Sequence, residues 1–368
     1  MEVEHGQRQA AIEWAKHALA RSRPGCELSS WRHQPLAGDA SSRSYERMSY
    51  CCETIETSRI LMISPPASGE KNAEFVAMQG ILQEIGIRVP HIYDREPVEG
   101  WMLLTDFGDR RYLDQIHAAQ SEQDLENLYH PALQVMAVVQ ACPLSKLAAL
   151  SVMNRERALS EMQLFPQWYL QGLLQIDIDP EAQAALTESL IWLADQFVQQ
   201  PMCLTHFDFH SCNLLYQDDG VPALLDFQDA LIAPWLLDPV SLLRDCYFEL
   251  KPHMQSRLLS FYVDRMQQLQ WQVHFEGRVQ NMPWSRIDRD QVRFWFEICS
   301  LQRHLRVLGT FGRLHLRDGR SAHLADLPAT LCYCLRAASE LPQLVPLLNV
   351  LKHSEPLLAR FLKDRDAF

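Results

Sequence analysis

Several signatures of secreted, membrane and zinc-binding proteins are missing from this sequence. Its 10 cysteines include no C-x-x-C pair, so nothing indicates a zinc ribbon or a thioredoxin-like redox motif. No apolar run approaches the roughly 18–20 residues that a membrane-spanning helix requires. The N-terminal segment is charged throughout and lacks the apolar stretch of a signal peptide. We therefore expect a cytoplasmic protein that has no membrane partner and whose cysteines are reduced.

Basic residues are in the minority. The chain has 34 Lys and Arg against 46 Asp and Glu, which gives a formal net charge of -12. This balance argues against a general nucleic-acid binder, which needs a basic face to displace counterions from phosphates. An anionic small molecule remains possible, because overall charge says nothing about a local basic pocket. Hydrophobic residues make up 47% of the chain, which is typical of a globular protein with a large core.

The sequence divides into two parts of different character. The N-terminal part contains one predicted helix, at about 72–85, with predicted β-strands on both sides of it. The strands are expected near 31–36, 43–50, 58–63 and 101–105. From about residue 120 onward the pattern is helical, and one non-helical island interrupts it. The long helical segments are predicted near 121–141, 151–173, 181–199, 237–250, 254–271, 289–315 and 340–365, and the island at 203–234.

A chain of 368 residues exceeds one ordinary domain. We predict an α+β protein with two lobes. Residues 1–106 form a small β-rich lobe with a leading helix, and residues 107–368 form a larger, mostly helical lobe.

The polar island contains the pattern H-x-D-x-x-x-x-N, from His206 through Asp208 to Asn213. Leu225-Asp226-Phe227 follows in the same island. In kinase-type phosphoryl transfer, the first Asp accepts the proton of the attacking hydroxyl, and the Asn and the later Asp hold Mg²⁺ against the nucleotide phosphates. Hard oxygen ligands are the ones that magnesium prefers. The spacing predicts Asp208 as the catalytic base and Asn213 and Asp226 as the metal ligands.

Two other interpretations of the island stay open. In an extended segment, His206, Asp208 and His210 share one face, which is also compatible with a zinc site. The two histidines are otherwise structural residues that orient the loop. A separate Asp106-Phe107-Gly108 precedes the island and is rejected as a metal site, because the metal-binding Asp must follow the catalytic loop. Its position after the strand at 101–105 favours a hinge whose Thr105 and Phe107 meet the adenine of the nucleotide.

The catalytic loop and Leu225-Asp226-Phe227 together resemble the aminoglycoside phosphotransferase family, small-molecule kinases with the protein-kinase-like fold. Residues 38–47, 226–230 and 309–314 are similar to a branch of it, the anomeric kinases of cell-wall recycling. The resemblance covers roughly residues 30 to 330. It implies ATP- and Mg²⁺-dependent phosphorylation of the C1 hydroxyl of N-acetylmuramate and N-acetylglucosamine, which gives sugar 1-phosphates for peptidoglycan recycling.

The resemblance also assigns a phosphate-facing hairpin, with Gly38, Ser41, Ser42 and Arg43 as nucleotide contacts. This sequence departs from ordinary kinases in one respect. In those kinases, a Lys on the third strand pairs with the nucleotide phosphates and with a Glu of a helix. The strand at 58–63 has no Lys in its interior. Lys71 comes later and has to reach back, and Glu74 is the candidate helix partner. We expect Arg43 to substitute for the missing Lys.

The expected sugar contacts are carboxylates, aromatic rings and guanidiniums, since a guanidinium can bind the lactyl carboxylate of N-acetylmuramate. They are Glu161, Trp168, Tyr169, Asp229, Arg244 and Arg303. Asp238 resembles the family's buried Asp that braces the catalytic loop. Two alternatives for function stay open: a kinase for an aminoglycoside or another small molecule, and a catalytically silent nucleotide-binding protein. The sequence does not indicate the oligomeric state.

Overall fold

The computed structural model describes residues 2–22, 28–36, 43–52, 55–269 and 271–366. The chain divides into two compact units. The first comprises Met1–Arg110 and Leu215–Asp229, and the second comprises Arg111–Leu214 and Ala230–Phe368. The first unit therefore ends close to the predicted boundary at residue 106. It also takes in a segment that the sequence analysis assigned to the helical lobe, and this segment carries Asp226 and Asp229.

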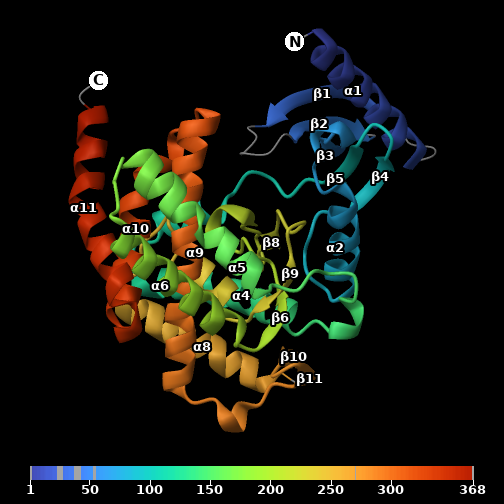
Figure 1. Cartoon of the computed structure of the whole chain (residues 1–368). Coiled ribbons are helices and arrows are strands. Elements are labelled where there is room, and N and C mark those ends of the chain that lie inside the picture. Colours follow the sequence, from blue (N-terminus) through green and yellow to red (C-terminus); the bar gives the residue numbers. More distant parts are fainter. Residues whose placement is uncertain (1, 23–27, 37–42, 53–54, 270, 367–368) are drawn as a thin grey trace. The chain divides into compact units, whose positions relative to one another are not determined.

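The first unit is built on a five-stranded antiparallel sheet with strand order β1-β2-β3-β5-β4. Its core lies where small residues of α1, such as Ala11 and Ala15, pack against Met48 and Leu61 of the sheet, and Figure 1 shows α1 in dark blue beside the strands. The small side chains let the helix lie close to the strands. The strands are β1 (Leu28–Leu36), β2 (Ser44–Cys52), β3 (Ile55–Ile63), β4 (Ile92–Glu96) and β5 (Trp101–Thr105), and α1 spans Glu2–Ser22.

One further helix belongs to this unit. α2 (Asn72–Glu84) buries Phe75, Met78 and Leu82, which are spaced for one helical face, and its bounds confirm the helix predicted at 72–85. A short 3-10 turn at Pro66–Ser68 precedes it, and β7 (Leu214–Leu215) pairs with β8 (Ala223–Leu224).

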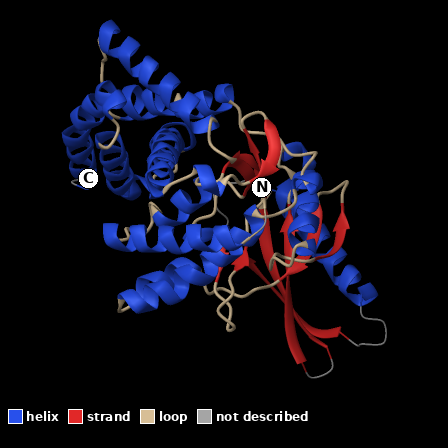
Figure 2. Cartoon of the chain, turned by 90° about the horizontal axis from the view of Figure 1, so that it is seen from below, coloured by secondary structure: helices blue, strands red, loops and turns tan. Residues whose placement is uncertain are grey.

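The second unit consists mainly of helices, drawn in blue in Figure 2. The helical segments predicted at 121–141, 181–199 and 289–315 are confirmed by α4, α6 and α9. The helices are α3 (Tyr112–Ala118), α4 (Glu122–Gln140), α5 (Arg155–Met162), α6 (Pro180–Val198), α7 (Leu237–Leu243), α8 (Pro252–Gln268), α9 (Arg289–Asp318), α10 (Leu327–Ser339) and α11 (Val345–Asp366). The segment predicted as one helix at 151–173 is instead α5 followed by a π-helix, Phe165–Leu173. Pro166 in its first turn cannot donate a backbone hydrogen bond.

A four-stranded sheet with strand order β11-β10-β6-β9 completes the second unit. Its strands are β6 (Met202–Thr205), β9 (Leu231–Pro234), β10 (Gln272–Phe275) and β11 (Arg278–Asn281). β6 and β9 lie at the two ends of the predicted non-helical island, which confirms it. The β10–β11 hairpin and α10 were not predicted.

Two glycines of α9 allow a close approach to the π-helix. A Cβ atom added at Gly309 would lie 2.2 Å from the backbone carbon of Leu164, and one at Gly312 would lie 2.7 Å from the backbone oxygen of Trp168. Real side chains do not tolerate such distances, so any other residue would push the two helices apart. The Gly-x-x-Gly pair therefore fixes α9 against the π-helix.

Among the described residues, no helix is long and apolar enough to cross a membrane. Cys52 is disulfide-bonded, so the expectation of reduced cysteines is wrong at this position.

Candidate active site

A buried carboxylate holds the start of the loop that follows β6. Asp238, at the beginning of α7, has no exposed surface. It accepts the backbone N–H groups of His206 at 2.7 Å and of Phe207 at 3.0 Å. Phe207 has a φ of 80°, which is costly for a residue other than glycine and persists only where its surroundings enforce it. The predicted bracing role of Asp238 is confirmed.

A second buried carboxylate holds the far end of the same loop, and sequence reasoning missed it. Asp245 accepts the backbone N–H of Ser211 at 2.9 Å and the hydroxyl of Ser211 at 2.5 Å. It also accepts the N–H of Tyr247 at 3.1 Å. The available signal was an acidic residue in the mostly apolar segment that follows Asp238. Together the two carboxylates fix the backbone on both sides of Asp208.

Asp208 lies between two guanidiniums. Its Oδ1 atom accepts from Arg306 Nη2 at 3.0 Å and is 3.5 Å from Arg303 Nη1, which also donates to the carbonyl of Phe207 at 3.0 Å. Burial raises the pKa of Asp208, but the charges of Arg306 and then Arg303 outweigh it and hold the pKa well below its usual value. The side chain remains 26% exposed. Asp208 is therefore an ionised carboxylate that a hydroxyl can reach.

Glu161 is the second carboxylate of this cluster. It accepts from Arg157 Nε at 3.1 Å and from Gln302 Nε2 at 3.0 Å. The guanidinium of Arg306 lies 4.1 Å from the ring centroid of Phe207, and that of Arg157 lies 5.4 Å from it. Neither Gln302 nor Arg306 was predicted. Their i, i+4 spacing on a long, mostly buried helix was the signal that could have found them.

Asn213 is oriented by the catalytic loop itself. Its amide nitrogen donates to the carbonyl of Asp208 at 3.0 Å and lies 3.2 Å from Nε2 of His210. These contacts occupy the nitrogen, so the side-chain oxygen is the atom suited to a cation. The Nδ1 atom of His206 accepts the N–H of Asp208 at 3.3 Å, which agrees with a structural role for this histidine. No group of three or more His, Cys, Asp or Glu side chains in the described ranges could hold a metal ion.

Asp226 and Asp229 belong to the first unit. Asp226 has a φ of 60°, a strained conformation that places its carboxylate differently from that of a strand residue. Its Oδ1 atom accepts from Gln228 Nε2 at 2.8 Å. Asp229 forms an ion pair with Lys71. The oxygens of Asn213 and Asp226 are the hard donors that Mg²⁺ prefers, so the donor chemistry of the predicted pair fits the metal.

Only some of the residues that we expect to contact the nucleotide phosphates in place of the third-strand Lys are among the described residues. Gly38, Ser41 and Ser42 lie outside the described residues. Arg43 is buried, lies 3.6 Å from a carboxylate oxygen of Glu70 and donates to the carbonyl of Lys71 at 3.4 Å. Glu74 is exposed on α2, and the described partner of Lys71 is Asp229.

The predicted hinge residues follow β5. The N–H of Thr105 donates to the carbonyl of His91 at 3.0 Å, and the carbonyl of Phe107 accepts from Gln217 Nε2 at 3.1 Å. The neighbouring Asp106 accepts two hydrogen bonds from the guanidinium of Arg47, at 2.7 and 3.0 Å. This pairing gives Asp106 a structural partner and agrees with its rejection as a metal ligand.

The π-helix carries both predicted aromatic contacts. Trp168 is half-buried. Tyr169 has no exposed surface, and its ring stacks on Phe165 with centroids 5.5 Å apart. The structure therefore places Tyr169 in the core of the second unit.

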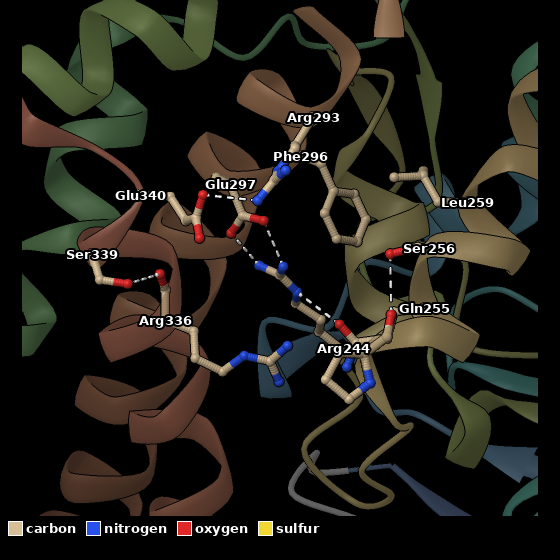
Figure 3. A pocket seen from close by; sticks show the side chains of 11 residues that line it. Arg244, Gln255, Ser256, Leu259, Arg293, Phe296, Glu297, Arg336, Ser339 and Glu340 are labelled. Atoms are coloured by element: carbon tan, nitrogen blue, oxygen red, sulfur yellow. Dashed lines mark hydrogen bonds and ion pairs between the residues drawn. The ribbon is translucent and has the colours of Figure 1, made fainter. Parts of the chain in front are cut away.

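Arg244 lies in a separate pocket of the second unit, with a volume of about 310 Å³ (Figure 3). Both terminal nitrogens of its guanidinium donate to the carboxylate of Glu297 at 2.6 Å, and its Nε is 3.3 Å from Gln255 Oε1. The pair is buried. The structure brings Glu161 and Arg303 together with Asp208, and it places Arg244 in an ion pair of its own.

The chain is similar to known phosphotransferases. The model of the phosphotransferase enzyme family (APH) matches residues 32–271. The chain is 29% identical over 318 residues to an N-acetylmuramate/N-acetylglucosamine kinase of Pseudomonas aeruginosa, covering 86% of this chain and 87% of that protein. It is 28% identical to a kinase of the same name from Neisseria meningitidis serogroup B, covering 86% and 88%.

Among solved structures, the ADP-bound aminoglycoside phosphotransferase APH(2'')-Ib has a TM-score of 0.55 at 13% identity, over 87% of this chain and 97% of that one. This likeness confirms the predicted fold class, a small β-rich lobe with a larger helical lobe. The family model covers more than half of the sequence, including the loop of Asp208 and the segment of Asp226. The chain therefore belongs to the phosphotransferase enzyme family.

Proposed function

We propose that this chain is an ATP-dependent kinase that phosphorylates the C1 hydroxyl of N-acetylmuramate and N-acetylglucosamine, and that it supplies sugar 1-phosphates for peptidoglycan recycling in the cytoplasm. The observation that carries the proposal is the ionised, partly exposed carboxylate of Asp208 in a loop braced at both ends. Relatives that bear the name of this activity match most of both chains. The solved aminoglycoside phosphotransferase supports the fold alone, because it shares 13% of the sequence.

In the proposed reaction, Asp208 orients the C1 hydroxyl by accepting its hydrogen bond. The hydroxyl oxygen then bonds to the γ-phosphorus of ATP, the bond from that phosphorus to the β-phosphate oxygen breaks, and the proton passes to Asp208. A carboxylate with a low pKa is sufficient, since an anomeric hydroxyl is more acidic than an ordinary alcohol and a loose transition state needs little help from a strong base. Positioning therefore contributes more than basicity.

Asn213 and Asp226 are the residues that would hold Mg²⁺. When bound, the ion neutralises charge on the nucleotide phosphates. The hydrogen bond from its amide nitrogen holds the side chain of Asn213, and Gln228 Nε2 donates to Oδ1 of Asp226.

For the nucleotide, we propose contacts from Gly38, Ser41, Ser42 and Arg43 to the phosphates. We also propose that the segment of Thr105 and Phe107 meets the adenine, with groups other than the N–H of Thr105 and the carbonyl of Phe107, which bond to His91 and Gln217. Arg43 already lies against Glu70 and Lys71, so its charge is held in place.

For the sugar, we propose contacts from Glu161, Trp168 and Arg303. Glu161 and Arg303 lie in the same cluster as Asp208. Arg244 fits this role less well because it forms an ion pair with Glu297, and Asp229 because it forms one with Lys71. Tyr169 fits it less well because it is buried in the core.

An aminoglycoside kinase is the second candidate from the sequence. The cluster argues against a polycationic substrate, because the guanidiniums of Arg157, Arg303 and Arg306 outnumber the carboxylates of Asp208 and Glu161. Like charges in a partly buried site repel.

Turnover of Mg-ATP with N-acetylmuramate, N-acetylglucosamine and a kanamycin-like amine tests the proposal. We expect phosphate on C1 of both sugars, identified by phosphorus NMR, and no turnover with the amine. Turnover of the amine alone would favour the aminoglycoside alternative. Mg-ATP binding without any phosphorylated product would favour a silent nucleotide-binding protein.

A further inference from the structure

Arg306 is the guanidinium that lies nearer to the catalytic carboxylate, at 3.0 Å against 3.5 Å for Arg303. It extends from the middle of α9, and its side chain is 17% exposed. Its Nη2 atom donates to Asp208 at 3.0 Å. Its Nη1 atom forms a longer ion pair with Glu161, at 3.9 Å. One side of this guanidinium therefore donates a hydrogen bond to Asp208, and the other, which meets Glu161 only at ion-pair distance, can donate to a further acceptor.

The surroundings favour an anion as that acceptor. The cluster of Arg157, Arg303 and Arg306 with Asp208 and Glu161 carries an excess of positive charge, although the whole chain has a formal net charge of -12. A carboxylate on the substrate would balance this local charge, whereas with a neutral sugar only the phosphates of ATP could do so.

The two arginines expected from the sequence to bind the carboxylate, Arg244 and Arg303, are more fully engaged than Arg306. Both terminal nitrogens of Arg244 bind Glu297. Arg303 is 8% exposed, and its Nη1 atom donates to the backbone carbonyl of Phe207. A substrate carboxylate has less access to either guanidinium than to Arg306.

We infer that Arg306 binds the carboxylate of the acidic amino sugar, and that this contact sets the preference for N-acetylmuramate over neutral N-acetylglucosamine. This inference rests on the proposed function. Arg306 is a selectivity residue in this account.

The test compares kcat/KM of the wild type and Arg306→Gln for N-acetylmuramate, for its carboxamide and for N-acetylglucosamine. A lost charge-assisted hydrogen bond corresponds to roughly 10- to 100-fold. We expect the substitution to lower kcat/KM for N-acetylmuramate by this factor relative to N-acetylglucosamine. The carboxamide should show no such selective loss, because it lacks the charge. Arg306→Lys should restore part of the selectivity.

Arg317→Gln is the matched control, since Arg317 is an exposed residue of the same helix that pairs with its neighbour Asp318. It should leave the ratio of the two sugars unchanged. An equal loss for both sugars in Arg306→Gln would overturn the inference and leave the proposed function intact. A wild-type protein that phosphorylates neither sugar would overturn the proposed function and this inference with it.

Discussion

The Oδ2 atom of Asp238 accepts the backbone N–H of His206 at 2.7 Å. Through this hydrogen bond and its companion to Phe207, a residue of α7 determines the backbone conformation immediately before Asp208. The bond joins residues that are distant in sequence, and both partners are buried. The catalytic loop therefore depends on a carboxylate that takes no part in the chemistry.

The first prediction concerns this brace. Asp238→Ala leaves two buried N–H groups without their acceptor, and each such loss costs about 1–3 kcal/mol. We expect urea-induced unfolding to show a destabilisation of roughly 2–6 kcal/mol and a reduced kcat. Asp264→Ala, at an exposed position of α8, is the control and should change stability by less than about 0.5 kcal/mol. Unchanged stability in Asp238→Ala would show that these hydrogen bonds do not support the loop.

The second prediction concerns the contact of α9 with the π-helix. Gly309→Ala places a methyl group 2.2 Å from the backbone of Leu164, and overpacking of this kind costs about 1–3 kcal/mol. We expect a lower melting temperature and a lower kcat/KM, because α9 carries Arg303 and Arg306. Gly80→Ala is the matched control, since an added Cβ in α2 meets nothing within 4 Å and alanine favours a helix by up to about 1 kcal/mol. Equal stability changes in the two variants would contradict the packing argument.

The third prediction concerns pH. Burial lowers the pKa of His304 to about 3, and its ring nitrogens lie 2.9 Å from the carbonyl of Arg244 and 2.7 Å from that of Ser300. The ordinary pKa in the unfolded chain is about 6.5, so the unfolded state binds a proton below that pH while the folded state does not. The contribution of neutral His304 to the free energy of unfolding is therefore fully present above pH 6.5. It is lost as the pH falls toward 3.

Between pH 6.5 and 5 this loss amounts to about 2 kcal/mol. His304→Gln should be less stable at pH 7 and should lack this part of the pH dependence. His353→Gln, at an exposed position of α11, should keep the wild-type dependence. The measurement is urea unfolding at several pH values, and an identical slope in wild type and His304→Gln would show that His304 is not the group responsible.

Local patterns predicted much of the fold and the centre of the site. The alternation and periodicity around residues 58–63, 72–85 and 101–105 predicted elements that the structure confirms, because in those segments one buried face repeats with the period of the element. The bracing role of Asp238 was implied by the resemblance to the family, and the hydrogen bonds to His206 and Phe207 confirm it.

Other features depend on contacts that no local pattern contains. Arg306 reaches Asp208 from 98 positions away in sequence, so only the packing of α9 shows that the two meet. The π-helix was predicted as ordinary helix, since its hydrophobic pattern is similar. Leu215–Asp229 joins the first unit through long-range contacts, and the sequence boundary at residue 106 had no signal for that return of the chain.

The most direct test of the account is the turnover of Asp208→Asn with Mg-ATP and N-acetylmuramate, measured together with Mg-ATP binding by calorimetry. Loss of a general base lowers the rate by roughly 10²–10⁴-fold, so we expect that loss in kcat while Mg-ATP affinity stays close to the wild-type value. Asp226→Asn should instead lose metal-dependent nucleotide binding. Wild-type turnover by Asp208→Asn would contradict the assignment of Asp208 as the group that receives the sugar's proton.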